Sequence, residues 1–233
     1  MIHWLHPRDP PDAFPPVSEA LTEPDGLLCA GGDLTPARIL AAYRRGIFPW
    51  YAAGQPILWW SPDPRLVLLP AELKVSRSLA KTLRHRGYRI TCDTCFAEVA
   101  ARCADTGARA FEGTWISPEM HAAYVELHRL GYAHSVEAWS GDDLVGGLYG
   151  LQLGQVFFGE SMFSTARDAS KVALHWLAQS LLARNVQLID CQVANPHLVS
   201  LGAKPMPRSE FLARLEAGIT DVRPGTAWQV PGP

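Results

Sequence analysis

The sequence of 233 residues has no long hydrophobic run, no strong excess of either charge and no dense set of cysteines. No apolar run approaches the length of a membrane-spanning helix, so we expect no membrane span. The opening residues MIHWLHPRDPP lack an apolar core and are interrupted by proline, so we expect no signal peptide. The five cysteines form no framework typical of secreted domains, which favours a cytoplasmic protein.

Recognisable cofactor and metal motifs are also missing. The residues GGD at 31–33 are not followed by the Lys-Ser/Thr pair of a phosphate-binding loop, and no HExxH or GxSxG pattern occurs. Cys92 and Cys95 have no second pair of cysteines or histidines at zinc spacing. We therefore predict neither a metal nor a cofactor.

Proline and tryptophan, by contrast, are abundant, with 19 and 8 residues. Tryptophan is costly to leave in water, so several of these side chains are expected to line a pocket or an interface. Trp50, Trp59, Trp60 and Trp115 can stack on an unpaired base, or they can pack in the core. The sequence alone leaves both interpretations open.

The order of the predicted elements indicates an α+β fold in two units, residues 1–60 and residues 61–233. In the first unit, a proline-rich lead-in precedes a helix that begins after Thr35 and ends at Gly46. In the second unit, helices alternate with strands around an antiparallel meander. We expect the two units to pack together, because no flexible linker separates them.

The meander and the elements that follow it are expected to carry the chemistry. Its predicted strands are His134–Trp139, Asp143–Leu153 and Gln155–Glu160. A long amphipathic helix over 168–184 follows, with Leu174 and Leu177 on its apolar face. The next predicted strand is Val186–Gln192.

A predicted helix over residues 75–86 is basic on one face. No acidic residue occurs from residue 73 to residue 92, although the net charge of the chain is −2. The basic residues of this helix are Arg77, Lys81, Arg84 and Arg86, with His85 among them. The first three are spaced to lie on one face, where they can neutralise consecutive phosphates. The alternative is a solvated helix face, the usual meaning of a run of charge.

Two further segments place polar groups in apolar surroundings. Glu160 lies between glycine and aromatic residues at the end of a predicted strand, where it can hold a hydroxyl or an amine, act as a base, or cap a turn. In the strand that contains Asp190, Cys191 and Gln192, the side-chain period of two places Asp190 and Gln192 on one face and Cys191 on the other. The polar pair serves a site or is satisfied by loop backbone.

Together these segments resemble the leucyl/phenylalanyl-tRNA–protein transferase family from about residue 24 to residue 215. The longest and most specific motifs are WWSPDPR (59–65) and GESMFS (159–164). The others are GGDL (31–34), RGIFPW (45–50), EGTWI (112–116), GYAHS (131–135), VGGLYG (145–150), ASK (169–171) and IDCQ (189–192).

The resemblance implies a small N-terminal domain and a larger C-terminal domain with the mixed sheet of acetyl-CoA-dependent N-acetyltransferases. It implies transfer of Leu or Phe, and less well Met, from aminoacyl-tRNA to proteins that begin with Arg or Lys. Such transfer marks those proteins for degradation. The implied enzyme is cytoplasmic, needs no metal or cofactor, and nothing in the sequence demands more than a monomer.

The resemblance also implies a role for individual residues. The catalytic pair is Asp190 and Gln192. The pocket for the aminoacyl side chain is Leu148, Phe157, Met162, Leu174 and Ile189. The 3′-adenosine and the acceptor are bound by Trp50, Trp115, Glu160 and Leu177. The tRNA is bound by Arg77, Lys81, Arg84 and His85. The sequence departs from the family at Leu148, where a Met is expected, and at Leu177, where a Phe helps to hold the adenosine. His85 replaces a basic residue and is partly charged near neutral pH.

Amide formation from an ester makes modest demands on the protein, because the acyl group is already activated. We expect Gln192 to contact the amine or the carbonyl and Asp190 to orient Gln192 or accept charge, while a tRNA ribose hydroxyl can carry the proton. The rival interpretations are an acyl-CoA-dependent N-acyltransferase, whose pyrophosphate-binding run is not found here, and a non-enzymatic RNA-binding module. Covalent catalysis by Cys191 is a third, because the thiol is a nucleophile.

Overall fold

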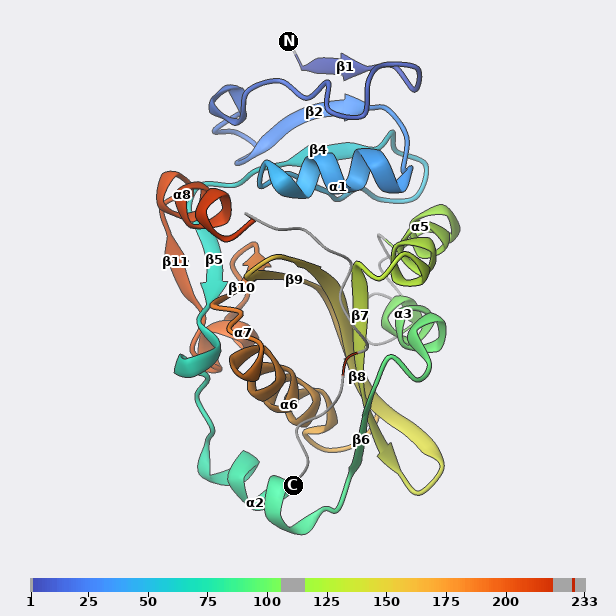
Figure 1. Ribbon diagram of the computed structural model, residues 1–233, viewed down its shortest axis with the longest axis vertical. Coiled ribbons are helices and arrows are strands. Elements are labelled where there is room, and N and C mark those ends of the chain that lie inside the picture. Colours follow the sequence, from blue (N-terminus) through green and yellow to red (C-terminus); the bar gives the residue numbers. More distant parts are fainter. Residues whose placement is uncertain (1, 106–115, 220–227, 229–233) are drawn as a thin grey trace.

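A computed structural model describes residues 2–105, 116–219 and 228. Two sheets organise these residues, one built from the first 60 residues and one from the rest of the chain. Figure 1 shows the smaller sheet at the top of the molecule and the larger one below it. The predicted α+β class, the small N-terminal unit and the mixed-sheet C-terminal unit are confirmed, whereas the boundary at residue 60 stays a prediction.

The N-terminal sheet has four short strands in the order β1-β2-β4-β3. They are β1 (His3–Leu5), β2 (Leu27–Gly31), β3 (Phe48–Pro49) and β4 (Leu58–Trp60). The short 3-10 helix η1 (Val17–Glu19) precedes β2, and helix α1 (Pro36–Arg44) lies beside the sheet, next to β3. The Thr35 hydroxyl accepts a hydrogen bond from the Arg38 backbone N–H, and Gly46 follows the helix at a φ of 69°. Both ends of the predicted helix are therefore confirmed.

The C-terminal sheet has seven strands in the order β11-β5-β10-β9-β8-β7-β6. They are β5 (Arg65–Leu68), β6 (Arg89–Cys92), β7 (Ala133–Ser140), β8 (Asp143–Leu153), β9 (Val156–Ser164), β10 (Leu188–Gln192) and β11 (Lys204–Met206). Strands β9 and β10 are parallel, and the other neighbours in this sheet are antiparallel. The predicted meander is confirmed as β7-β8-β9.

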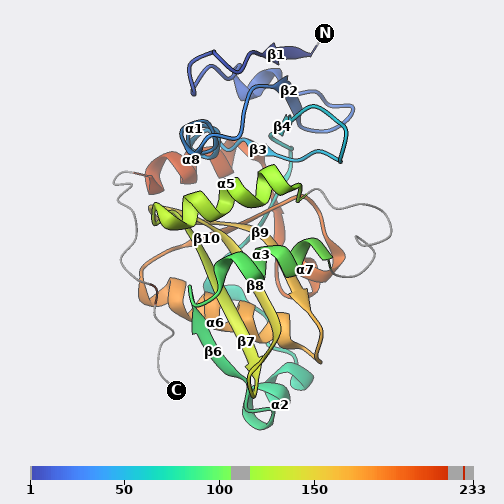
Figure 2. The same cartoon turned by 90° about the vertical axis from the view of Figure 1, so that its right-hand side faces the viewer.

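Helices cover both faces of the larger sheet. Helix α6 (Ala169–Ala183) lies on one face, and α3 (Phe96–Asp105) and α5 (Pro118–Arg129) lie on the other (Figures 1 and 2). The predicted apolar face of α6 is confirmed, because Leu174 and Leu177 are buried. The remaining helical segments are η2 (Pro70–Glu72), α2 (Arg77–His85), α7 (Pro196–Ser200) and α8 (Arg208–Gly218). No helix within the described residues is both long and apolar enough to cross a membrane.

Strand β9 corrects one prediction. The sequence was expected to leave the strand at Glu160, but β9 continues to Ser164. In the pairing with β8, Tyr149 faces Ser161 and Gly150 faces Gly159, so Glu160 is an extra residue in a β-bulge. Gly150 makes this close pairing possible, because a Cβ atom there would lie 2.1 Å from the Phe158 carbonyl oxygen. Glu160 therefore neither ends a strand nor caps a turn.

The close packing of α6 on β8 generates a stability prediction. A Cβ atom on Gly146 would lie 2.6 Å from the Ala169 Cβ and 3.0 Å from the Ser170 backbone nitrogen, in the first turn of α6. Gly146→Ala must therefore shift the helix, and we expect the free energy of unfolding in urea to fall by about 1–3 kcal/mol.

Gly218→Ala is the matched control, because the added Cβ would meet its nearest neighbours at 3.4 Å and 3.5 Å, in ordinary contact at the end of α8. Since alanine is the better helix former, this variant should be unchanged or more stable by up to about 1 kcal/mol. Equal losses in the two variants would contradict the close approach of α6 to β8.

Candidate functional site

A cavity of about 640 Å³ opens between the larger sheet, helix α6 and the segment that follows β3. Its volume is typical of small-molecule sites. The predicted aminoacyl-pocket residues all line it: Leu148 from β8, Phe157 and Met162 from β9, Leu174 from α6, and Ile189 from β10. Trp50, Glu160, Leu177 and Gln192 line it as well. Trp50 and Gln192 are 142 positions apart in the chain, yet both line this one largely apolar cavity.

Among the described residues that line this cavity, Glu160 is the acidic one. Two tyrosines hold its carboxylate by hydrogen bonds. Its Oε1 accepts a 2.6 Å hydrogen bond from the Tyr43 hydroxyl of α1, and its Oε2 accepts a 2.8 Å bond from the Tyr124 hydroxyl of α5. The two hydroxyl oxygens are 2.7 Å from each other. Tyr43 and Tyr124 are completely buried, and Glu160 is 9% exposed. Three elements from both units of the chain therefore meet at one carboxyl group.

The pKa of Glu160 is raised to about 7. Burial is the largest cause, and it outweighs the hydrogen bonds from Tyr43, Tyr124 and Gln192, which lower the pKa. Proton counting supports the direction of the shift. Three short oxygen–oxygen contacts join the two tyrosines and the carboxyl group, but the tyrosines supply only two hydrogens. A protonated Glu160 supplies the third: it donates to one tyrosine, which then donates to the other, and the second tyrosine donates back to the carboxyl group, so the neutral form satisfies all three contacts.

Gln192 meets Glu160 from the end of β10. Its Nε2 donates a 3.2 Å hydrogen bond to Glu160 Oε1. Its backbone has a φ of 64°, in the left-handed region that side chains other than glycine rarely adopt. The pairing of β10 with β5 also slips here, since Asp190 faces Val67 and Gln192 faces Leu66. This second bulge leaves Cys191 as the extra residue and turns Gln192 into the cavity.

The bulge overturns the expectation that Asp190 and Gln192 share a face. Gln192 lines the cavity, whereas Asp190 is absent from its lining and is fully buried. The period of two fails because it assumes regular pairing, which stops between these two residues. Asp190 still touches its partner, because the Gln192 backbone N–H donates a 2.8 Å hydrogen bond to Asp190 Oδ1. The Asp190 side chain is thus linked to the Gln192 backbone.

Arg65 neutralises Asp190. Its Nε and Nη2 donate to the two carboxylate oxygens at 2.8 Å and 2.7 Å, and both side chains are completely buried. The third nitrogen, Nη1, donates to the Gly46 carbonyl oxygen of the N-terminal unit. The guanidinium also lies over the rings of Phe48 and Phe211, at 4.6 Å and 4.7 Å. Asp190 is therefore a paired carboxylate that does not line the cavity.

The predicted thiol geometry is also wrong. Cys191 was expected to point away from Gln192, but both side chains line the cavity, again because of the bulge. Burial raises the pKa of the Cys191 thiol far above its ordinary value, which disfavours the thiolate that a nucleophile needs. Within the described residues, no three His, Cys, Asp or Glu side chains are grouped as metal ligands would be.

The predicted tryptophans differ in their exposure to solvent. Trp59 is completely buried, and its Nε1 donates to the Gly31 carbonyl, so it packs in the N-terminal core. Trp50 is 41% exposed at the mouth of the cavity, with the Trp60 ring 5.7 Å away. The Trp60 Nε1 donates to the Trp50 carbonyl and fixes that backbone. Trp115 lies outside the described residues.

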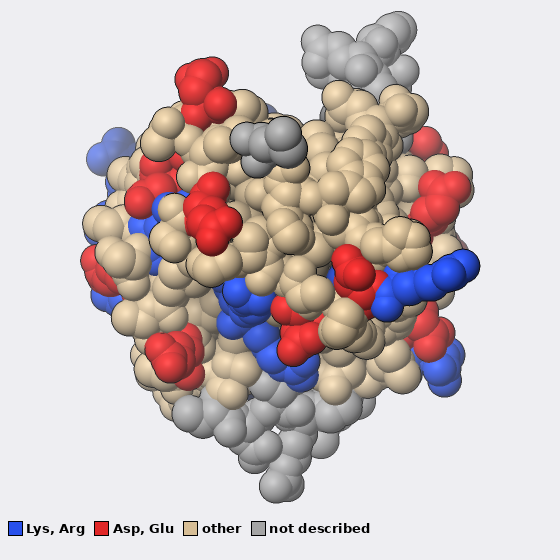
Figure 3. All heavy atoms as spheres, turned by 90° about the horizontal axis from the view of Figure 1, so that it is seen from above, with Lys and Arg blue, Asp and Glu red and all other residues tan. Residues whose placement is uncertain are grey.

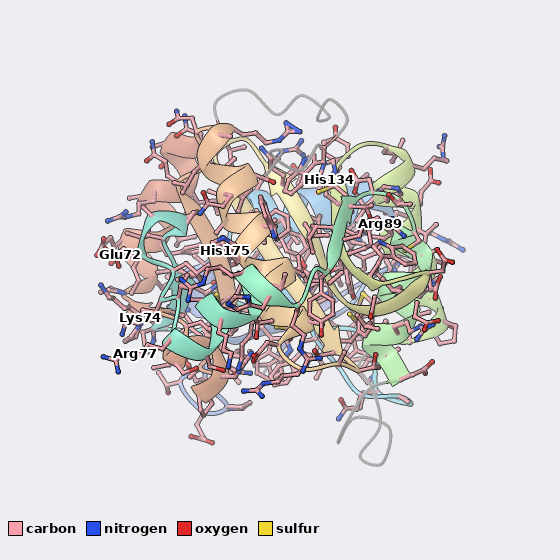
Figure 4. The ribbon with its side chains drawn as sticks, turned by 90° about the horizontal axis from the view of Figure 1, so that it is seen from below. Glu72, Lys74, Arg77, Arg89, His134 and His175 are labelled. Carbon is pink, nitrogen blue, oxygen red and sulfur yellow. The ribbon has the colours of Figure 1, made fainter. Side chains whose placement is uncertain are left out.

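Helix α2 carries the predicted basic surface. Its positions Arg77, Lys81, Arg84 and His85 are all exposed. Figures 1 and 2 place α2 at the end of the molecule opposite the N-terminal sheet, and Figure 4 shows Lys74 and Arg77 at this end. On the face seen from above, by contrast, acidic and basic side chains are mixed (Figure 3). Helix α2 is therefore a locally basic surface of a chain whose net charge is −2.

Sequence reasoning missed three residues of this arrangement: Tyr43, Tyr124 and Arg65. Both tyrosines lie on helices whose local pattern signals only an apolar face. Arg65 offered a signal, since it begins a strand whose next residues are apolar, and an arginine there needs a buried partner. The polar residues Ser170, Asn195 and His197 also line the cavity and were not predicted.

Known protein families, curated proteins and solved structures include proteins similar to this chain. The model described as leucyl/phenylalanyl-tRNA protein transferase matches residues 67–216, and the model of its N-terminal domain matches residues 32–63. Among curated relatives, the leucyl/phenylalanyl-tRNA–protein transferase of Azoarcus sp. (strain BH72) is 58% identical and covers 98% of this chain and 95% of its own. That of Aromatoleum aromaticum is 60% identical and covers 97% and 93%.

Solved structures are more distant. A GCN5-related N-acetyltransferase from Kribbella flavida is 12% identical and covers 72% of this chain and 60% of its own, with a TM-score of 0.41. A TM-score at that level does not by itself define the fold or the activity.

The buried Glu160 generates a prediction about pH. Between about pH 4.5 and pH 7 the folded protein keeps the Glu160 proton while the unfolded chain loses it, so ionisation of this group lowers the free energy of unfolding as pH rises through that range. Glu160→Gln removes the titration. Urea unfolding should therefore show the variant gaining roughly 2–3 kcal/mol relative to the parent protein between about pH 5 and pH 8. Parallel profiles would show that Glu160 titrates normally.

The buried ion pair generates a second prediction. Arg65→Met leaves Asp190 charged and without its partner, and we expect a loss of about 3–5 kcal/mol in the free energy of unfolding. Arg214→Met, which removes the partner of Glu210 in an exposed pair of similar length, 2.8 Å, should cost less than about 1 kcal/mol.

A double variant, Arg65→Met with Asp190→Leu, keeps this test decisive if the single variant does not fold. Removing both charges should recover much of the loss, because no unpaired carboxylate remains buried. No recovery would mean that Arg65 contributes through its packing between Phe48 and Phe211.

Proposed function

The chain belongs to the leucyl/phenylalanyl-tRNA–protein transferase family, and on that premise we propose that it is a cytoplasmic, monomeric aminoacyltransferase. The proposed reaction moves Leu or Phe, and less well Met, from aminoacyl-tRNA to the N-terminal α-amine of proteins that begin with Arg or Lys. The modified proteins are thereby marked for degradation. The observation that carries this proposal is the apolar cavity with the Glu160–Gln192 pair at its edge.

The wall of the cavity supports an apolar aminoacyl group. Leu148, Phe157, Met162, Leu174 and Ile189 form its apolar part. A polar side chain placed against these five residues would lose its hydrogen bonds to water without replacement. Discrimination among apolar side chains should be partial, because one methylene changes binding by only about 1–3 kcal/mol. Such partial discrimination is compatible with the proposed transfer of Met, at a lower rate than Leu and Phe.

The acceptor is proposed to approach from the Glu160 side. Its α-amine must be neutral to attack, and since such amines have a pKa near ~8, little assistance is needed. A carboxyl group with a pKa of about 7 can hold a cationic acceptor when ionised and return a proton when neutral. The negative form of Glu160 also favours acceptors that begin with Arg or Lys.

Gln192 and Asp190 are proposed to have different roles at the reaction centre. The Gln192 side chain reaches the cavity and can contact the amine or the ester carbonyl. Asp190 is engaged by Arg65 on both oxygens and by the Gln192 N–H, so its proposed role is to orient Gln192. Since Asp190 does not line the cavity, a ribose hydroxyl of the tRNA is the better proposed carrier of the proton.

The donor is proposed to bind at two places. Its 3′-adenosine stacks on the half-exposed ring of Trp50, with Leu177 opposite as an apolar contact. Trp115 is proposed to take part from outside the described residues. Farther along the tRNA, Arg77, Lys81, Arg84 and His85 contact phosphates. An apolar cavity for the amino acid and a basic helix for the nucleic acid together fit aminoacyl-tRNA better than acyl-CoA.

The test is transfer of radiolabelled Leu from charged tRNA to a model protein that begins with Arg, compared with the same protein that begins with Gly. We expect label on the first protein at a rate at least about tenfold above the second, because Glu160 is the acidic group of the cavity. Equal labelling would contradict the proposed acceptor choice. No labelling of either, with tRNA still bound, would favour an RNA-binding module.

A further inference from the structure

Helix α2 carries two hydroxyl side chains besides its basic residues. Ser78 is exposed, like Arg77, Lys81 and Arg84, whereas Thr82, one turn later on the helix, is 6% exposed. Residues four positions apart on a helix share a face, so the two hydroxyls form a short stripe. Both hydroxyls are used in contacts with the same distant turn of the chain.

That turn is Arg167–Asp168, immediately before α6. Asp168 Oδ2 accepts a 3.1 Å hydrogen bond from the Thr82 hydroxyl, and Arg167 Nη2 donates a 3.2 Å bond to the Ser78 hydroxyl. The Arg167 carbonyl accepts a third bond, 3.1 Å long, from the Tyr88 hydroxyl just beyond the helix. Three hydrogen bonds thus join the two residues of the turn to α2 and its exit.

Asp168 makes these contacts at a cost to its own helix. It is the N-cap residue of α6, where an aspartate normally accepts a hydrogen bond from the first turn, but its side chain makes no capping bond. Its backbone is left-handed, with a φ of 59°. The carboxylate instead reaches Thr82 and Lys171, and these hydrogen bonds lower the pKa of Asp168 although burial opposes them. Strain of this kind persists where the surroundings fix it.

The turn also connects α2 to the cavity. Ser170, Leu174 and Leu177 follow Asp168 on α6, and all three line the cavity. A donor that contacts the basic face of α2 and places its acylated end in the cavity requires both sites to be held at a constant separation. The segment that begins at Asp168 therefore connects the hydrogen bonds with α2 to the residues of α6 that line the cavity.

We propose that Asp168 is a positioning residue that fixes the basic helix α2 relative to the aminoacyl cavity and thereby sets the affinity for a full-length charged tRNA. The inference rests on the proposed tRNA-binding role of α2. Asp168 does not line the cavity, so it acts on how the donor is held and leaves the reacting groups unchanged.

The test compares two donors with the variants Asp168→Ala and Thr82→Val. One donor is leucyl-tRNA, and the other is the leucyl ester of adenosine, which is too short to reach α2. For leucyl-tRNA we expect KM to rise about threefold to tenfold, the effect of one lost hydrogen bond, with kcat changed by less than about twofold. For the leucyl ester of adenosine both constants should stay within about twofold.

Two further variants sharpen the comparison. Thr82→Ser keeps the hydroxyl and should restore the KM for leucyl-tRNA. Thr94→Val removes a hydroxyl that bonds only the local Cys92 carbonyl, and it should change neither donor. A parallel rise in KM for the short donor would overturn the proposal, because the variants would then be disturbing the cavity itself.

A separate variant tests the premise. Lys81→Met with Arg84→Met removes two exposed cations from α2 without touching the Asp168 contacts. An unchanged KM for leucyl-tRNA in this variant would reject α2 as the tRNA site. An increased KM here, together with unaltered kinetics in Asp168→Ala, would keep the tRNA site and reject the positioning role.

Discussion

A guanidinium group and a carboxylate that have both lost all contact with water lie at the centre of this molecule, at Arg65 and Asp190. Buried charges are tolerated only when each is paired and its remaining donors are used, and here Arg65 also binds the Gly46 carbonyl. Arg65 begins the first strand of the larger sheet, Asp190 belongs to its neighbour and Gly46 to the N-terminal unit. The position of β10, and with it Gln192, depends on this arrangement.

Two β-bulges complete the site that the ion pair anchors. Regular strands would alternate their side chains and would direct Gln192 to the face of Asp190. Instead, one bulge releases Glu160 from the β8–β9 pairing, and the other turns Gln192 toward it at a left-handed φ. The resulting 3.2 Å contact joins two strands that are neighbours in the sheet. Irregular pairing therefore places Glu160 and Gln192 together in a largely apolar cavity.

Local signals allowed much of the fold to be predicted, and non-local contacts explain what was missed. Thr35, Gly46 and the apolar face of α6 marked helices correctly, because caps and periodicity act within a few residues. The short strands β1 and β11 and helix α7 were missed, since three to five residues carry too little pattern. The cavity residues were located through motifs, but the partners of Glu160 are 117 and 36 positions away and leave no local trace.

Three residues of the N-terminal unit contribute to the cavity or to the ion pair beside it, and this limits how the chain can change over evolution. Tyr43 reaches Glu160, the Gly46 carbonyl accepts from Arg65, and Trp50 stands at the mouth of the cavity. These residues lie within eight positions of one another on a unit that contributes no strand to the larger sheet. The smaller unit is therefore not an exchangeable module. Recombination that brought in a foreign N-terminal segment would have to supply the same tyrosine, carbonyl and indole together, so the two halves are expected to be inherited as one piece.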